Sequence, residues 1–364
     1  MLESWFDGAI QCCADAWIAY DCETRPPAAG MRMELPRAIR QAVDAALEGA
    51  TLADLQRAAQ RLSERYRSET RDGRQHLSDE MAALAYLAAR MPATYAAIHA
   101  SLDAVAALRP DFAPITMLDV GAGPGTGVFA AQDCWPDIGE ITLIENAAAI
   151  RAVGERLLTA GDFRQSQWLL HDIAAFPVLD KSYDLVLIAY VLDEVVPSAI
   201  GPLIERLWAT TADTLMVVEP GTPAGWSRIL EVRAQLLAAG AYLVAPCPHA
   251  QACPLAPPDW CHFSRRVARS RMHRQIKSAD VPWEDEKFIY IAASRKEGER
   301  PQARVIAPPL VRGGTVSLKL CENSGAAALR LRSRREGEAF RRARRLAWGD
   351  VIWPDAIIPT DSTA

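Results

Sequence analysis

Between residues 115 and 239 the chain alternates short apolar segments with longer amphipathic ones, and this alternation constrains the fold more than any other feature. The apolar segments are ITMLDV, EITLIEN, QWLLHD, YDLVLIAYVLDEV and TLMVVEPG. Continuous apolar runs of this length fit strands that are buried on both faces of a parallel sheet. We therefore predict an α/β fold with a doubly wound, mostly parallel sheet that carries helices on both sides.

The regions on either side have a different composition. The first 110 residues are rich in alanine and leucine with helical periodicity, whereas the end of the chain mixes β-prone runs such as TVSLKLC with the basic stretch GEAFRRARRLAWGD. We predict three domains. These are a helical domain at 1–110, a Rossmann-like domain at 111–296 with a cysteine-loop insertion at 245–277, and a small basic, β-containing C-terminal region at 297–364.

Charge and apolar content restrict the class of protein. The net charge is −5 and half of the residues are hydrophobic, but no apolar run approaches the roughly 18 residues of a membrane helix. The start, MLESWFDGAIQCC, lacks the basic lead and apolar stretch of a secretory signal, and its acids argue against a transit peptide. We expect a cytoplasmic, bacterial protein that does not contact membranes, whose eight cysteines are thiols or ligands rather than disulfides.

The sequence LDVGAGPGTG joins the first predicted strand to a helix. It places Asp119 at the end of the strand and Gly121, Gly123 and Gly125 in the turn, where glycine lets the backbone approach a ligand closely. A dinucleotide-binding loop would require a glycine at the position of Thr126. Glu145 ends the second strand, where a carboxylate can accept hydrogen bonds from ribose hydroxyls. A glycine turn without a ligand is the weaker alternative.

This combination resembles the class I S-adenosylmethionine-dependent methyltransferases. The resemblance implies a class I, Rossmann-like sheet that binds S-adenosylmethionine. It implies that Asp119 and the backbone of the glycine loop hold the methionine end of the cofactor, that Glu145 binds the ribose and that Asp172 lies beside the adenine. The loop residues concerned are Gly121, Ala122, Gly123 and Gly125.

Residues for methyl transfer are not identifiable from the sequence. The Asn/Asp-Pro-Pro-aromatic motif of many base N-methyltransferases would fall at the end of the fourth strand, where the chain reads Ala-Tyr-Val-Leu at 189–192. A cysteine nucleophile for methylation at pyrimidine carbon is missing near the ends of strands four and five. Tyr190, Asp193 and Glu194 are the nearest polar candidates, and whether the chain is an enzyme stays open.

The stretch APCPHAQACPLAPPDWCH contains three cysteines among five prolines. Cys247, Cys253 and Cys261 are six and eight positions apart, which matches neither a zinc ribbon nor a bacterial ferredoxin. Proline excludes regular helix or strand here, so three thiolates and a fourth ligand closing on a metal would explain how the loop is held. His249, His262 and the distant Cys321 are the candidates for the fourth ligand.

Two basic segments follow the cysteine loop, and such segments suit phosphate contacts, although a solvated basic surface is the alternative. The candidate RNA-binding residues are Arg265, Arg266, Arg269, Arg271, Arg274, Lys277, Arg334, Arg335, Arg341, Arg342, Arg344 and Arg345.

Taken together, these features resemble the methyltransferase-like assembly factors of the small ribosomal subunit, found in mitochondria and bacteria. The resemblance is carried by LDVGAGPGTG, AYVLDEV, VVEPGTPAGW, APCPHAQACPL, WCHFSRRVARSRMHRQIK with WEDEKFIYIAASR, and RRARRLAWGD.

The family resemblance implies a [4Fe–4S] cluster on Cys247, Cys253, Cys261 and Cys321. Zinc is the alternative metal, because both accept four thiolates. It also implies binding to small-subunit ribosomal RNA, a role in ribosome assembly or translation, and a mitochondrial location for eukaryotic relatives. An active rRNA methyltransferase and, less favoured, a small-molecule methyltransferase are the alternative functions. Away from the ribosome we expect a monomer.

Overall fold

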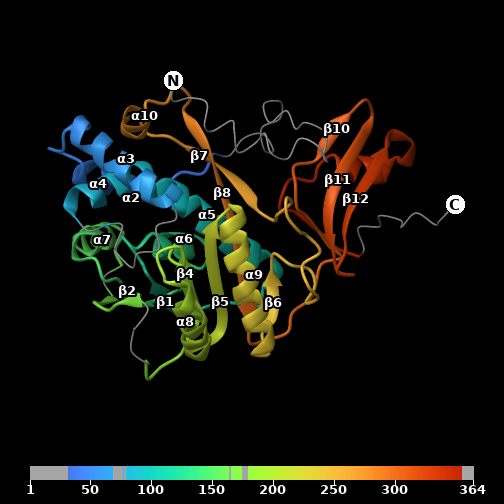
Figure 1. The fold of residues 1–364 in the computed structure, drawn as a ribbon, viewed down its shortest axis with the longest axis horizontal. Coiled ribbons are helices and arrows are strands. Elements are labelled where there is room, and N and C mark those ends of the chain that lie inside the picture. Colours follow the sequence, from blue (N-terminus) through green and yellow to red (C-terminus); the bar gives the residue numbers. More distant parts are fainter. Residues whose placement is uncertain (1–31, 69–76, 78, 164, 174–178, 355–364) are drawn as a thin grey trace.

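The computed structural model describes residues 32–68, 77, 79–163, 165–173 and 179–354. Its larger sheet has eight strands in the order β3-β2-β1-β4-β5-β8-β6, with β7 also paired to β8 (Figure 1). The strands are β1 (Thr116–Val120), β2 (Glu140–Ile144), β3 (Ser166–Leu169), β4 (Tyr183–Ala189), β5 (Thr211–Pro220), β6 (Tyr242–Ala245), β7 (Phe263–Ala268) and β8 (Trp283–Ser294). Each of the five apolar segments of the sequence overlaps one of the strands β1 to β5.

The strand order identifies the class of the sheet. Strands β3, β2, β1, β4 and β5 pair in parallel, in the 3-2-1-4-5 order of a doubly wound sheet. Strand β8 lies antiparallel between β5 and β6. An antiparallel strand at this place is typical of the class I methyltransferase fold, so the predicted fold class is confirmed.

Helices cover both faces of this sheet. Figure 1 shows α9 (Pro223–Ala238) in front of β5 and β8 and α5 (Met91–Leu108) behind them. The remaining connections carry α6 (Thr126–Cys134), α7 (Ala148–Ala160), α8 (Pro197–Thr210) and the short α10 (Arg271–Lys277). Buried apolar side chains on both faces of the strands pack against these helices, which explains why the strand sequences are continuously hydrophobic.

The helices before the sheet share its hydrophobic core. They are α2 (Arg37–Ala46), α3 (Leu52–Ser68), α4 (Glu80–Ala89) and α5. Asp79 caps α4, because its side chain accepts a hydrogen bond from the backbone N–H of Ala82 at 2.8 Å. All eight α4 residues from Ala82 to Ala89 are buried. The predicted domain 1–110 stays a prediction as a unit, and its residues 1–31 lie outside the described part of the chain.

The C-terminal region contains a second sheet with a small core of its own. Its strands are β9 (Ala303–Val305), β10 (Leu310–Arg312), β11 (Thr315–Glu322), β12 (Ala327–Ser333) and β13 (Val351–Ile352). The helical segments η3 (Arg334–Glu336) and α11 (Glu338–Ala343) lie between β12 and β13 in the sequence. Val305, Leu318 and Phe340 belong to this second core. Figure 1 shows the sheet beside the main body, at the right.

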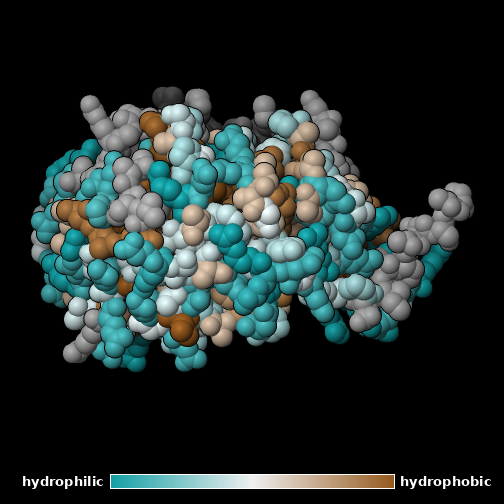
Figure 2. Space-filling model, turned by 90° about the horizontal axis from the view of Figure 1, so that it is seen from below, coloured by the Kyte–Doolittle hydropathy of each residue, from teal (hydrophilic) through white to brown (hydrophobic). Residues whose placement is uncertain are grey.

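The surface agrees with this division between core and solvent. Figure 2 shows a largely hydrophilic face seen from below, with hydrophobic side chains in small groups. Among the described residues, no helix has the length and apolar character needed to cross a membrane.

Candidate cofactor and cysteine sites

The glycine loop between β1 and α6 has the backbone conformation that its sequence predicts. Gly121, Gly123 and Gly125 all have positive φ, at 72°, 55° and 82°. A Cβ on Gly121 would lie 2.4 Å from Val191, so this glycine allows the loop to pack against the segment after β4. A Cβ on Gly123 would meet nothing within 4 Å. The loop therefore faces open space at Gly123, on the side where a ligand could approach.

Two buried carboxylates flank this loop. Glu145 accepts hydrogen bonds from the backbone N–H groups of Gly123, at 2.9 Å, and Ala147, at 2.7 Å. Asp119 is also buried, and its Oδ2 has no hydrogen-bond partner. Burial and the nearby Glu145 raise the pKa of Asp119 to about 8. A cation bound at Asp119 would compensate its charge, and Glu145 keeps acceptor capacity because each carboxylate oxygen has two lone-pair sites.

Side chains of the helical region lie next to the carboxyl ends of β1 and β4. Tyr86 of α4 is buried there, and its hydroxyl lies 3.3 Å from the Thr94 hydroxyl of α5. At the junction of the two helices, Arg90 contacts both carboxylate oxygens of Glu286 on β8, at 3.3 and 3.1 Å. The same carboxylate accepts a hydrogen bond from the Tyr190 hydroxyl at 2.9 Å.

Tyr190 is the first residue after β4, and its backbone is unusual. Its φ is 59°, which is rare for a bulky residue and marks a position held by its surroundings. Its hydrogen bond to Glu286 occupies the side chain that the sequence offered as a polar candidate for catalysis. Asp193 is buried, and Asp172 is exposed just after β3, next to Ile173, whose side chain is close to Gly121.

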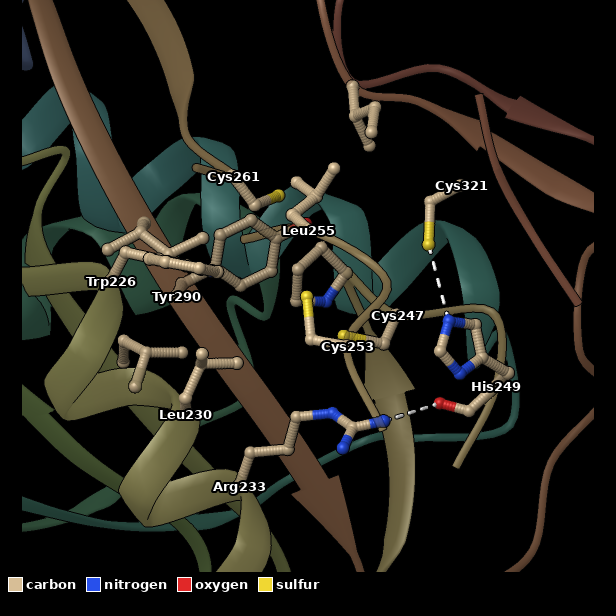
Figure 3. A pocket seen from close by; sticks show the side chains of 14 residues that line it. Trp226, Leu230, Arg233, Cys247, His249, Cys253, Leu255, Cys261, Tyr290 and Cys321 are labelled. Carbon is tan, nitrogen blue, oxygen red and sulfur yellow. Dashed lines mark hydrogen bonds between the residues drawn. The ribbon is translucent and has the colours of Figure 1, made fainter. Parts of the chain in front are cut away.

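The cysteine loop connects β6 to β7, and residues 246–262 contain no regular helix or strand. Its Cys247, Cys253 and Cys261 and the distant Cys321 of β11 line one pocket (Figure 3). The rest of the wall is mostly apolar and aromatic, and includes Trp226, Leu230, Leu255, Ile289 and Tyr290. The structure thus brings together the four cysteines that the family resemblance selected.

Cys321 contacts a histidine of the cysteine loop. Its Sγ lies 3.4 Å from Nε2 of the buried His249, which also lines the pocket. His262, the other candidate ligand, stacks instead on Trp260 and contacts Trp348 edge-on. The pocket therefore offers four sulfurs and one imidazole, with Cys321 contributed by the C-terminal sheet.

Burial and mutual proximity suppress ionisation of these thiols. Burial and the neighbouring thiols raise the pKa of Cys321 to about 12 and that of Cys261 well above its usual value. Cys253 has a raised pKa for the same main reason, burial. A positively charged metal group would remove this penalty, because the thiolate is the ligand form.

The four thiols form a donor set that can bind a metal group. The described cysteines, including all four of the pocket, are free thiols. A single zinc ion at about 2.3 Å from each sulfur would need the four sulfurs to converge on one point. Within the described residues, no three His, Cys, Asp or Glu side chains are gathered closely enough to hold one metal ion.

The first basic segment is largely engaged inside the protein. Glu284 of β8 pairs with Arg269 at 3.1 Å and with Lys277 at 2.8 Å. Asp285 pairs with Arg266 at 2.8 Å, and Arg265 is half-buried. Arg271 is exposed and Arg274 partly so, and both line an open depression at α10.

The second basic segment is exposed. All six of its candidate arginines lie on the surface around η3 and α11, namely Arg334, Arg335, Arg341, Arg342, Arg344 and Arg345. Arg341 and Arg342 contact Glu338 at 2.8 and 3.7 Å. Contact with RNA by either segment is a prediction that the structure alone does not test.

Comparison with known proteins identifies the family. Residues 80–354 match the family Rsm22, described as mitochondrial small ribosomal subunit Rsm22. The chain belongs to the Rsm22 family. The predicted resemblance to methyltransferase-like factors of the small ribosomal subunit is thereby confirmed.

Members of the wider group with curated descriptions are distant in sequence. The human ribosome assembly protein METTL17, mitochondrial, is 29% identical over 298 residues, which cover 76% of this chain and 64% of the human protein. The Rsm22-cox11 tandem protein 2, mitochondrial, of Schizosaccharomyces pombe is 23% identical over 323 residues, covering 74% and 43%. The chain thus spans less than two thirds of these relatives.

Solved methyltransferase structures match part of this Rsm22 family chain at low similarity. Magnesium protoporphyrin IX methyltransferase from Synechocystis, with bound SAH, has a TM-score of 0.36 at 13% identity, covering 64% of this chain and 94% of that chain. The N-methyltransferase NodS from Bradyrhizobium japonicum has a TM-score of 0.36 at 17% identity, covering 55% and 94%. The strand order, rather than these likenesses, establishes the fold class.

Sequence reasoning did not identify several residues at these sites. Tyr86 and Arg90, which lie beside the glycine loop and the end of β4, belong to no sequence motif. Arg233 of α9 and Arg304 of β9 are buried beside the cysteine pocket. The signal for Arg233 was available in WSRILEVRAQLLAAG, because it lies four residues after Ile229 and three before Leu236, on the apolar face of the helix.

The raised pKa of Asp119 gives a testable pH dependence. A folded-state pKa of about 8, above the usual 3.8, makes ionisation unfavourable in the fold, so stability is lost as the pH rises from about 4 through 8. Asp119→Asn should therefore stabilise the ligand-free protein at pH 8.5, by an amount on the order of a few kcal/mol. At pH 4 the two proteins should unfold together.

Chemical denaturation at the two pH values measures this difference. Asp103→Asn, at an exposed position of α5, is the control for a general effect of removing one carboxylate. An Asp119→Asn protein that is less stable than wild type at pH 8.5 would show that the carboxylate is ionised and stabilised in the fold.

Proposed function

We propose that this protein is an assembly factor of the small ribosomal subunit that binds S-adenosylmethionine, holds a [4Fe–4S] cluster and contacts ribosomal RNA. Family membership and the methyltransferase-like fold supply the frame. One observation carries the proposal: Cys247, Cys253, Cys261 and Cys321 line a single pocket although Cys321 is 60 positions beyond the loop. By its family the protein would act on ribosomes, as a monomer away from them, in the bacterial cytoplasm or in mitochondria.

The four thiols are compatible with an iron–sulfur cluster, and the family resemblance favours iron over zinc. Four thiols with apolar and aromatic neighbours are the usual ligands and surroundings of a [4Fe–4S] cluster. Among the described residues, no three ligand side chains gather around one point, as a single zinc ion would need. Such a cluster would supply cross-linking between the cysteine loop and the C-terminal sheet.

The glycine loop supports the cofactor part of the proposal. Asp119 would receive the positively charged methionine end of S-adenosylmethionine, and its buried Oδ2 has no hydrogen-bond partner in the fold. Glu145 would bind the ribose, and Asp172 would lie beside the adenine. The backbone of Gly121, Ala122, Gly123 and Gly125 would complete the site.

The cluster is tested by metal content. Protein purified without oxygen should be brown and contain iron and inorganic sulfide. Cys321→Ser should lose most of both, and should also lower the unfolding temperature of the C-terminal sheet, because it removes the ligand from β11. His249→Ala should keep the iron and sulfide. A wild-type protein that contains only zinc, or a cluster lost with His249 and kept without Cys321, would contradict this assignment.

RNA binding is tested by its dependence on salt. Arg344 and Arg345 are exposed and have no carboxylate partner among the described residues. Arg344→Gln/Arg345→Gln should weaken binding to a small-subunit rRNA transcript and reduce the slope of log affinity against log salt by about one to two. Arg266→Gln removes an arginine already paired with Asp285 and serves as the matched control. Equal slopes for all three proteins would exclude this surface.

Methylation of ribosomal RNA is a second candidate, favoured by the two buried carboxylates at the glycine loop. Gly123→Arg separates it from the assembly role, because a side chain at this position projects into open space and would fill the cofactor site. The variant should lose S-adenosylmethionine binding yet support subunit assembly in a deletion strain. Gly123→Ala shares the backbone strain, about 1 kcal/mol, and is the matched control. Failure of assembly in the Arg variant alone, with loss of one rRNA methyl mark, would favour the enzyme.

A further inference from the structure

Two arginines are buried next to the cysteine pocket without acidic partners. Arg233 and Arg304 are 5% and 3% exposed. Neither has a carboxylate within salt-bridge distance among the described residues. Burying a cation costs several kcal/mol unless a nearby negative charge compensates it. The fold therefore places two positive charges at a point where a counter-charge is needed.

The two side chains approach the pocket from different elements. Arg233, on α9, lines the pocket and donates a hydrogen bond to the carbonyl oxygen of His249 at 3.0 Å (Figure 3). It also donates a hydrogen bond to the carbonyl oxygen of Gln251 at 2.6 Å. Arg304, on β9, lies directly opposite Cys321 in the antiparallel pair, so both side chains are on the same face of the sheet.

Arg304 also holds the start of the cysteine loop. It donates hydrogen bonds to the carbonyl oxygens of Pro246 and Gly349, both at 2.6 Å. In addition, Arg233 Nε and Arg304 Nη2 are buried N–H groups without a partner. Carbonyl contacts alone would not require a charged side chain, and they leave these donors unused.

Both arginines lie close to the thiols. Arg233 lines the same pocket as the four cysteines, and Arg304 is the cross-strand neighbour of Cys321. Four thiolates on an oxidised [4Fe–4S] core leave a net charge of about −2, which two arginines balance.

We propose that Arg233 and Arg304 are the charge-compensating residues of the four-cysteine site, and that their positive charges make the bound cluster easier to reduce. The inference rests on the proposed cluster. Reduction adds one electron to an already anionic group, and a buried cation stabilises the more negative state. Charge close to a cluster and hydrogen bonds to its sulfurs are the protein's main means of setting its potential.

The test is a redox titration of full-length protein reconstituted with ferrous iron and sulfide, with mediator dyes and dithionite as the reductant. Arg233→Gln and Arg304→Gln should each lower the ratio of reduced to oxidised cluster at a fixed potential about tenfold, which corresponds to about 59 mV for one electron. Arg233→Lys and Arg304→Lys keep the charge and should stay close to wild type. Arg312→Gln removes an exposed arginine from the same small sheet and should change nothing.

Each result distinguishes the proposal from its foundation. Glutamine variants that load a cluster and keep the wild-type potential would overturn it, as would lysine variants that shift as far as glutamine ones. If the glutamine variants take up no iron and the lysine variants do, the need for charge is supported. If neither does, the carbonyl contacts explain the arginines and the proposal fails. A wild-type protein without iron and sulfide would refute the cluster itself.

Discussion

The antiparallel pairing of β8 with its neighbours holds the parts of this molecule together. Hydrogen bonds join β8 to β5, β6 and β7, so both ends of the cysteine loop are fixed to one strand. Side chains of the same strand reach each functional region. Tyr290 lines the cysteine pocket, Glu286 joins Arg90 to the end of β4, and Glu284 holds the first basic segment. A substitution in this strand would therefore disturb the surroundings of the glycine loop and the cysteine pocket together.

The C-terminal sheet depends on a different set of contacts. Its apolar core is separate from that of the main body, and polar links join the two near the cysteine loop. Lys319 pairs with Asp259 at 2.5 Å, and Arg304 reaches the carbonyl oxygen of Pro246. Cys321 lies between these links, opposite Arg304. Filling the pocket with a cluster would add a covalent connection between the cysteine loop and the C-terminal sheet.

Local patterns predicted the sheet and its glycine loop, because strands β1 to β5 and the positive φ at Gly121 depend on nearby residues. Long-range pairing was beyond such patterns. Contacts between segments far apart in sequence determine three features. These are the place of β8 between β5 and β6, the packing of α4 and α5 beside the glycine loop, and the position of Cys321 near the cysteine loop. The cysteine spacing alone left His249 and His262 open as ligands. Likewise, the sequence could not reveal that Arg269 and Lys277 share Glu284.

The arginines of this chain occupy two physically distinct environments, which differ in burial. The exposed arginines around α11, such as Arg344 and Arg345, lie in water, where salt screens their attraction for phosphate within about 8–10 Å. Arg233 and Arg304 act at short range in a site of low polarity, where salt has little access. Raising the salt concentration should therefore weaken the proposed contact with RNA while leaving the electrostatics of the cysteine pocket unchanged. Because one group of arginines is exposed and the other is buried, the two proposed roles can be varied independently.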